Sequence, residues 1–136
     1  MSPLEMQFLV GLGVSIVIGL VIGLERESRN KDAGISTHIL VIAGAMLFTQ
    51  ISAIVDPAST SRIASQIIPG IGFLGAGLIL KEGGNVRNLT TAASLWFSAA
   101  IGMAIGFGFI TIAAIAGIAC ALIPRIPSVR KHDQGD

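Results

Sequence analysis

Long uncharged apolar runs, separated by short segments that hold nearly all of the charges, dominate this chain of 136 residues. An α-helix rises about 1.5 Å per residue, so about 20 apolar residues cross the hydrocarbon core of a bilayer. The pattern predicts an all-α, polytopic membrane protein with five transmembrane helices. The expected spans are Leu4–Leu24, Ile39–Val55, Ile63–Leu80, Thr90–Ile105 and Phe107–Ile123. Residues 1–124 would then form one transmembrane domain and residues 125–136 a polar cytoplasmic tail.

The distribution of positive charge predicts the orientation of these spans. With five spans, eight of the nine Lys and Arg residues share one side of the membrane, and Arg62 alone lies on the other. Because basic residues are retained in the cytoplasm, the N-terminus is expected outside and the C-terminus inside. The uncharged run 92–123 is too long for one span, and Gly106-Phe107-Gly108 divides it into a tight helical hairpin.

Composition and charge exclude several function classes. Charged residues make up 12% of the chain, against about 25% in soluble domains, and the net charge of +1 gives no sign of a nucleic-acid partner. No nucleophile–base arrangement and no phosphate-binding loop are visible, and His38 and His132 lie at a loop end and in the tail. The single cysteine, Cys120, cannot form an internal disulfide. We therefore expect no enzyme and no bound cofactor.

Small residues recur every four positions along the first and fourth spans. In the first span they are Gly11, Ser15, Gly19 and Gly23. Helices in lipid approach closely at small residues, so this face predicts either packing inside the chain or a homodimer seam. The stripe of the fourth span is Thr90, Ser94, Ser98, Gly102 and Gly106. Its hydroxyls could bond a neighbouring helix, bond their own helix carbonyls, or line a narrow polar path.

The third span combines Pro69 with Gly70, Gly72, Gly75 and Gly77. Proline removes a backbone donor, and glycines beside it predict a kinked or locally unwound helix. Irregular backbone is tolerated in membranes where it is buried in protein or lines a wet cavity, and transporters place binding sites at broken helices. The kink could equally serve tight packing. The glycines match the spacing of a dinucleotide site, but no strand precedes them.

Charged residues gather at the span ends rather than at the span centres, which counts against a transporter with a charged site at the membrane midplane. Glu25 lies against the first span, where Arg26 or Lys81 could compensate its charge. Two further carboxylates, Glu27 and Glu82, are expected on the same side and could converge with Glu25 on Mg²⁺, which prefers oxygen ligands. A solvated, loosely paired rim explains them equally well. On the opposite side, Asp56 and Arg62 could pair.

Three stretches together resemble one family. They are Ile22–Glu27 with Ala33–Thr37, then Asp56-Pro57 followed by Arg62–Ile67, then Gly70–Gly77 leading into Val86–Trp96. The blocks GIGFLGAG and LTTAASLW, in this order and spacing, are similar to those of the MgtC/SapB family of bacterial inner-membrane proteins. The resemblance covers roughly residues 8 to 120.

The resemblance implies a five-span protein of the bacterial plasma membrane. Family members are linked to growth at low magnesium and, in pathogens, to survival inside macrophages; some are described as restraining the ATP synthase and so affecting membrane potential. Virulence-type members carry a C-terminal soluble domain and tend to have Asn and Cys where this chain has Thr90 and Phe97. The chain therefore resembles a short, general member of the family.

Two hypotheses of function follow, together with a third that the sequence neither supports nor excludes, a lipid or small amphiphile as ligand. The first is a modulator of another membrane complex, such as the ATP synthase, or of ion homeostasis. The alternative is a channel or transporter for magnesium or another cation, with Gln66, Thr90 and Ser94 converging on a hydrated path along the third and fourth spans. Either protein is expected to self-associate in the bilayer, because its two glycine faces need partners. The candidate functional residues are Glu25, Arg26, Glu27, Asp56, Arg62, Gln66, Gly70, Gly72, Gly75, Gly77, Glu82, Arg87, Thr90, Thr91, Ser94 and Trp96.

Overall fold

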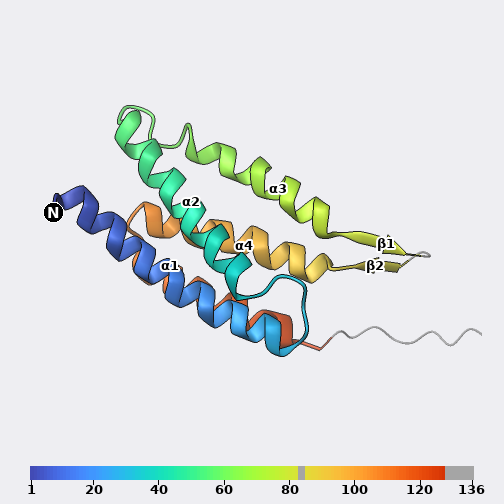
Figure 1. Ribbon diagram of the computed structural model, residues 1–136. Coiled ribbons are helices and arrows are strands. Elements are labelled where there is room, and N and C mark those ends of the chain that lie inside the picture. The colour runs from blue at the N-terminus through green and yellow to red at the C-terminus, as the bar shows by residue number, and fades with distance from the viewer. Residues whose placement is uncertain (83–84, 128–136) are drawn as a thin grey trace, which may run out of the picture.

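The computed structural model describes residues 1–82 and 85–127, and for residues 80–82 and 85 it describes the backbone alone. Within these residues the chain is almost entirely helical, as predicted (Figure 1). Its α-helices are α1 (Pro3–Ser28), α2 (Ile35–Val55), α3 (Ile67–Leu78), α4 (Leu89–Gly106) and α5 (Ile110–Leu122). Short 3₁₀ helices, η1 (Ala64–Gln66) and η2 (Ile123–Arg125), precede α3 and follow α5.

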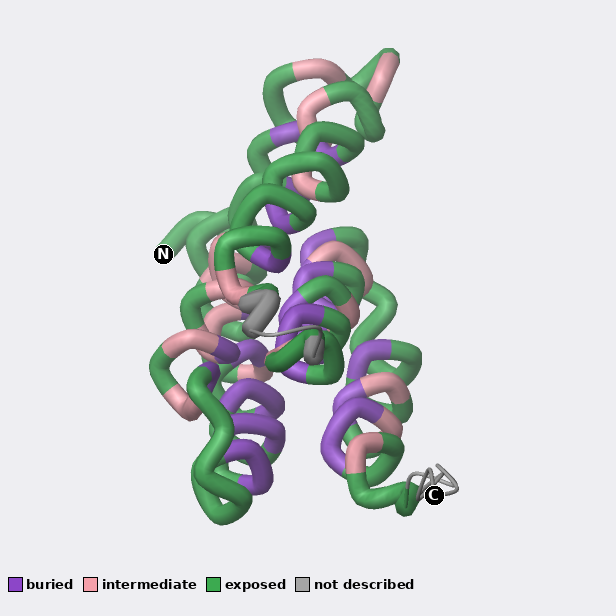
Figure 2. Tube along the Cα trace, turned by 90° about the vertical axis from the view of Figure 1, so that its right-hand side faces the viewer, coloured by how far each residue is buried: buried purple, intermediate pink, exposed green. Residues whose placement is uncertain are grey.

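Consecutive helices run in opposite directions. α2 packs between α1 and α4, α5 packs on α1 and α4, and α3 packs on α4 (Figure 1). Buried positions concentrate where these helices face one another (Figure 2). One end of the bundle is formed by the last turns of α1 and α5 and the first turns of α2 and α4. We call it the charged end, because it carries Glu25, Arg26, Arg29 and Arg125.

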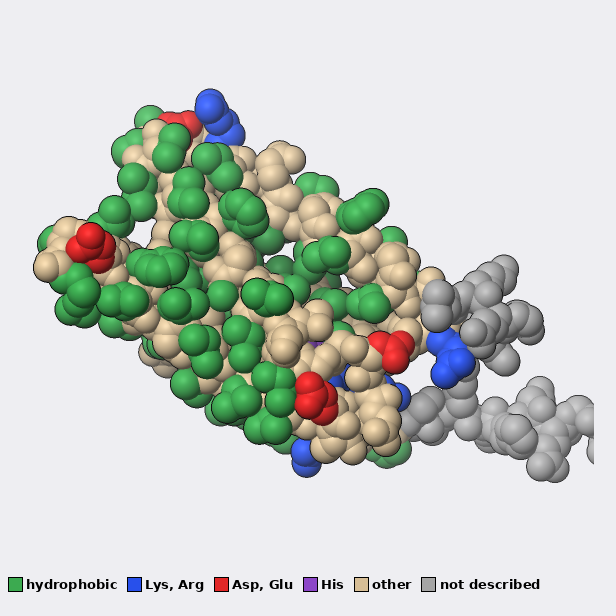
Figure 3. Space-filling model, viewed as in Figure 1, with side chains coloured by type: hydrophobic (Ala, Val, Ile, Leu, Met, Phe, Trp, Pro, Cys, Tyr) green, Lys and Arg blue, Asp and Glu red, His purple; other side chains and the backbone are tan. Residues whose placement is uncertain are grey.

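Three helices, α1, α2 and α4, are long and apolar enough to cross a membrane, whereas α3 with η1 and α5 with η2 are shorter apolar segments. Hydrophobic side chains cover the middle of the face shown in Figure 3, and charged side chains lie towards its ends. Large apolar side chains point outward from every helix, among them Leu40 at 71% exposure and Phe73 at 81%. Such a surface is stable in lipid and not in water. The five helices are confirmed as helices, while their number as spans and their orientation stay predictions.

Close packing of α2 against α1 and α4 depends on glycine. A Cβ on Gly23 would overlap the backbone of Ile35, and a Cβ on Gly102 would overlap the carbonyl oxygen of Ile42. Gly19 meets Ile39 in the same way, with a Cβ only 2.7 Å from the Ile39 Cα. The small-residue face of α1 is therefore occupied inside the chain rather than left as a dimer seam, in agreement with the first of the two interpretations.

The third helix differs from the predicted kinked span. α3 is a continuous α-helix that begins at Ile67, so Pro69 lies in its first turn, where the missing N–H is not needed. The irregularity is confined to the preceding 3₁₀ turn, η1. The helix ends at Leu78 and not at Leu80, because Leu80–Glu82 (β1) forms an antiparallel hairpin with Asn85–Arg87 (β2). This small sheet is absent from the prediction.

The predicted hairpin between α4 and α5 is confirmed. α4 ends at Gly106, and Gly108 adopts a left-handed conformation with φ of +85°. The Gly108 N–H bonds the Ile105 carbonyl at 2.9 Å, and the Phe109 N–H bonds the Ala104 carbonyl at 2.8 Å. These two bonds form a Schellman motif, which ends α4 and lets α5 begin at Ile110.

Candidate functional site

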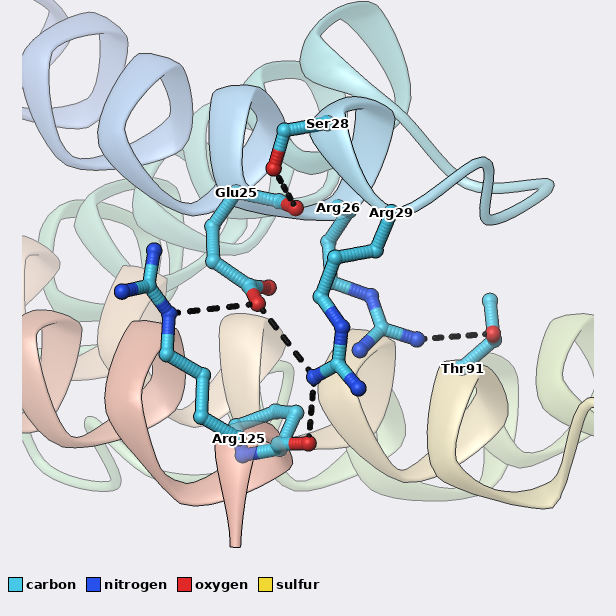
Figure 4. Close-up of polar contacts among 7 residues, drawn as sticks. Glu25, Arg26, Ser28, Arg29, Thr91 and Arg125 are labelled. Atoms are coloured by element: carbon cyan, nitrogen blue, oxygen red, sulfur yellow. Dashed lines mark hydrogen bonds and ion pairs between the residues drawn. The ribbon is translucent and has the colours of Figure 1, made fainter. Parts of the chain in front are cut away.

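The strongest concentration of buried charge lies at the charged end, where the last turn of α1 faces η2 and the first turn of α4 (Figure 4). Glu25 and Arg26 are 5% and 0% exposed, although they are charged. They are joined by Arg29, at the C-terminus of α1, and Arg125, in η2. We call these four residues, with Thr91, the arginine cluster.

Arg26 points from α1 to the first turn of α4. Its Nη2 donates a hydrogen bond of 2.9 Å to the Oγ1 of Thr91, which is 1% exposed. Among the described residues its Nε and Nη1 have no hydrogen-bond partner. An arginine carries five N–H donors, and burying a charge without partners is costly. Arg26 therefore retains unused binding capacity inside the bundle.

Glu25 is balanced by two other arginines. Its Oε1 lies 3.5 Å from the Arg29 Nη1 and 3.6 Å from the Arg125 Nε. Arg29 also donates to the Pro124 carbonyl, which ties the end of α1 to η2. Of the two compensating partners that the sequence suggested, Arg26 bonds Thr91 instead, and the side chain of Lys81 lies outside the described part.

A second polar group, centred on His38, continues from the cluster into the bundle. His38 is fully buried; its Nδ1 lies 2.8 Å from the Gly34 carbonyl oxygen and its Nε2 lies 3.2 Å from the Ser94 Oγ. Ser94 donates to the Thr91 carbonyl at 2.8 Å, and the Cys120 thiol lies 3.8 Å from the Ser94 carbonyl oxygen. These contacts join α2, α4 and α5 directly beside the arginine cluster.

Glu27 and Arg87 lie outside the cluster. Glu27 is exposed, and its Oε1 accepts a hydrogen bond of 2.9 Å from the Ile35 N–H, so it caps α2 at a position where Gly34 offers no side chain. Arg87 is exposed on β2. The expected convergence of Glu25, Glu27 and Glu82 stays a prediction, because the Glu82 side chain is outside the described residues. In the part of the chain that is described, no three His, Cys, Asp or Glu side chains gather as a metal site.

The remaining candidates are spread over the molecule. Asp56 and Arg62 pair at the far end, the arrangement that the sequence left open, with 3.5 Å between Oδ2 and Nη1. Gln66 lies there too, at the edge of an apolar groove of about 400 Å³ between α2 and α3. Thr90 and Trp96 are exposed on α4. Because α3 begins at the far end and α4 at the charged end, Gln66 lies far from Thr90 and Ser94.

The glycines of α3 line no cavity inside the bundle. Gly75 is buried, and its nearest neighbour is Ala92 of α4. A Cβ on Gly70, Gly72 or Gly77 would meet nothing within 4 Å. These three glycines therefore face away from the rest of the bundle, with Gly70 and Gly77 on one side of α3 and Gly72 on another, and Gly70 lines the groove that Gln66 borders.

Sequence reasoning missed three residues of this site. Arg29 and Arg125 were counted only as loop and tail charges, and His38 was placed at a loop end. A helical signal did exist for Arg29, which follows Glu25 by four residues and so lies on the same face of α1. No local signal connects Arg125 with Glu25.

Comparison with known proteins gives a consistent result. The family model described as "MgtC family" matches residues 12–129. The Protein MgtC of Brucella abortus (strain 2308) is 49% identical over 108 residues, which are 79% of this chain and 45% of that protein. The Protein MgtC of Salmonella typhimurium (strain LT2) is 48% identical over 101 residues, which are 74% of this chain and 44% of that protein. The chain thus spans about half the length of these curated relatives. No solved structure matches it.

Proposed function

Because the chain belongs to the MgtC family, we propose that it is a membrane protein of magnesium homeostasis that modulates another membrane complex. Family membership and the apolar helices support a membrane protein with a role in magnesium homeostasis. The proposed setting is the bacterial inner membrane, with five spans and the charged end in the cytoplasm. The ATP synthase is the partner complex that the family resemblance suggests.

The observation that carries the modulator role is that several buried hydroxyls of the bundle are satisfied by carbonyl groups of their own helices. Ser15 bonds the Gly11 carbonyl at 2.7 Å, and Thr49 bonds the Ala45 carbonyl at 2.8 Å. Ser94 likewise bonds the Thr91 carbonyl. A hydroxyl that is satisfied in this way needs neither water nor an ion. In the stripe of α4, Ser98 is fully buried without a hydrogen-bond partner among the described residues, but Gly102 and Gly106 pack directly against α2. This close contact favours helix packing over conduction.

An unpartnered helix face supports the same proposal. Among the described helices α3 packs mainly on α4, and Phe73 and the glycines at 70, 72 and 77 face outward. In lipid, small residues let another helix approach its neighbour's backbone closely. A helix of a partner complex could pack on this face without displacing any contact inside the chain.

A substitution on α3 tests this role. A Cβ on Gly72 of α3 or on Gly13 of α1 meets nothing within 4 Å, so Gly72→Leu and Gly13→Leu both extend into open space. Each variant is expressed in a strain that depends on the protein for growth at low magnesium. The strain with Gly13→Leu should grow, and the strain with Gly72→Leu should not. Equal growth with both variants at equal membrane levels would contradict a partner face on α3.

Conduction is tested separately with the purified chain in liposomes that hold a magnesium-sensitive dye. Under our proposal, entry of Mg²⁺ does not exceed that of empty liposomes. Flux that disappears in Gln66→Leu and Thr90→Leu would establish the alternative, a magnesium or other cation channel or transporter. Since these two residues lie at opposite ends of the α3–α4 pair, such a path would need several copies of the chain.

A further inference from the structure

The arginine cluster contains more positive charge than its own carboxylate balances. Arg26, Arg29 and Arg125 contribute three guanidinium groups, and Glu25 contributes one carboxylate. Glu25 makes its ion pairs with Arg29 and Arg125, whereas Arg26 feels the Glu25 charge without an ion pair and makes its one side-chain hydrogen bond among the described residues to the neutral Thr91. Arg29 also lies near enough to Arg26 for their charges to repel, which offsets part of the attraction of Glu25, and Figure 4 shows the two side chains extending in the same direction.

From this arrangement we infer that the arginine cluster is a binding site for a phosphate group, with the unpartnered Nε and Nη1 of Arg26 as its innermost donors. Guanidinium groups match the oxygens of phosphate with two parallel hydrogen bonds, and these charge-assisted bonds are among the strongest in proteins. A bound anion would satisfy the buried donors of Arg26 and would relieve its repulsion with Arg29. This inference does not depend on whether the chain is a modulator of another complex or a cation channel.

The outer part of the site lies at the surface of the charged end. The side chains of Arg29 and Arg125 are 41% and 61% exposed, whereas Arg26 behind them is fully buried. Because the Nε and Nη1 of Arg26 are buried, an anion that enters from the end of the bundle reaches them when the exposed side chains of Arg29 and Arg125 move apart. Glu25 limits the attraction, because its carboxylate shares the same space and repels an anion.

The phosphate has two possible sources, a free anion and a lipid headgroup. The charged end lies where the apolar surface stops, which is the depth of phospholipid headgroups, and basic pockets between membrane helices bind anionic lipids. An apolar groove of about 270 Å³ between α4 and α5 reaches Pro124, whose carbonyl accepts from Arg29. A lipid acyl chain has room there, while free phosphate would use the arginines alone.

The test measures the thermal midpoint of the purified full chain in an uncharged detergent. One arm compares sodium phosphate with sodium chloride at equal ionic strength, and the other compares added phosphatidylglycerol with phosphatidylcholine. The proposal predicts a higher midpoint with phosphate, with phosphatidylglycerol, or with both. A response to phosphatidylglycerol alone identifies a lipid headgroup, and a response to phosphate identifies the free anion. No selective response in either arm would overturn the proposal.

Matched variants locate the effect. Arg26→Gln should weaken the apparent affinity at least about tenfold, because it removes charge-assisted hydrogen bonds. Arg62→Gln removes one positive charge at the far end of the bundle and should respond like the unmodified chain. An unchanged response in Arg26→Gln would overturn the site.

Glu25→Gln provides a test that does not depend on the folding of Arg26→Gln. Removing the competing carboxylate should tighten anion binding several-fold, since it leaves the three guanidinium groups without an internal counter-charge. Unchanged or weaker binding in a folded Glu25→Gln protein would contradict the assignment. A cluster with a purely structural role would lose stability in this variant without gaining affinity for phosphate.

Discussion

The backbone of Ile35, in the first turn of α2, lies so close to Gly23 of α1 that the two helices have no room for a Cβ between them. Gly23 precedes Glu25 by two residues, and Ile35 is the first residue of α2 after the loop that joins the two helices. The contact therefore sets how closely the end of α1, with its charged residues, lies against α2. Helix packing and the geometry of the arginine cluster depend on the same glycine.

Gly23→Ala should therefore destabilise the chain by about 1–3 kcal/mol, because α1 and α2 must separate to admit the methyl group. Thermal or SDS-induced unfolding in detergent, followed by circular dichroism, measures the loss. Gly13→Ala on the same helix is the control, since a Cβ there meets nothing within 4 Å. Equal stability of the two variants would contradict the close contact.

The cap on α2 gives a second prediction. Glu27→Ala removes the acceptor of the Ile35 N–H and should cost about 1 kcal/mol, as the loss of a helix cap usually does. Glu27→Gln keeps an acceptor oxygen and should restore part of the stability. Unfolding of the two variants under the same conditions decides between a capping role and a role of the negative charge. A loss as large in Glu27→Gln as in Glu27→Ala would rule out the cap.

Ser52 organises the loop between α2 and α3, and this leads to a third prediction. It is fully buried; its Oγ donates to the Thr60 carbonyl and accepts from the N–H groups of Ile63 and Ala64 at 3.1 and 3.2 Å. Ser52→Ala leaves these groups without a partner, at a cost of about 1–3 kcal/mol. Hydrogen exchange should accelerate over residues 60–66.

Ser65→Ala is the control for this loop, because Ser65 is exposed and its hydroxyl donates to the Arg62 carbonyl, at 2.8 Å. Its exchange pattern should match that of the unmodified chain. If Ser52→Ala and Ser65→Ala change exchange over residues 60–66 equally, Ser52 does not organise the loop.

Helix positions could be predicted from the sequence because uncharged runs are bounded by charges and glycines. Predicted and observed ends agree at Val55, and they differ by one residue at Thr90 and Leu89. The third span was extended too far, to Leu80, because an apolar residue in a strand of the hairpin is indistinguishable from one in a helix. Pro69 suggested a kink because the predicted span began at Ile63, which would place the proline inside the helix. The α-helix begins only after η1 ends at Gln66, so Pro69 lies in the first turn.

The site was harder to predict because its contacts join distant segments. Glu25, Arg26 and Thr91 were candidates, but the Arg26–Thr91 bond spans 65 positions and depends on how α1 and α4 are rotated about their axes. Arg125 reaches Glu25 only because α5 packs against α1. A single sequence does not specify how each helix is rotated about its axis or which other helices it contacts. Gln66 and Thr90 are both polar, but they lie at opposite ends of the bundle. Their expected convergence rested on residue type alone, which does not give position in the fold.

The orientation inferred from the basic residues can be tested with cysteines. Cys120 is 3% exposed and should resist maleimide until the chain is unfolded, so Cys120→Ser provides a background without other thiols. In that background, Ala58→Cys lies in the loop before α3 and Lys31→Cys in the loop before α2; both positions are exposed. Since basic residues are retained in the cytoplasm, a membrane-impermeant maleimide should label Ala58→Cys in intact cells and Lys31→Cys only after permeabilisation. Labelling of Lys31→Cys alone in intact cells would reverse the orientation and place the arginine cluster on the outer surface. Labelling of both would be inconsistent with α2 crossing the membrane.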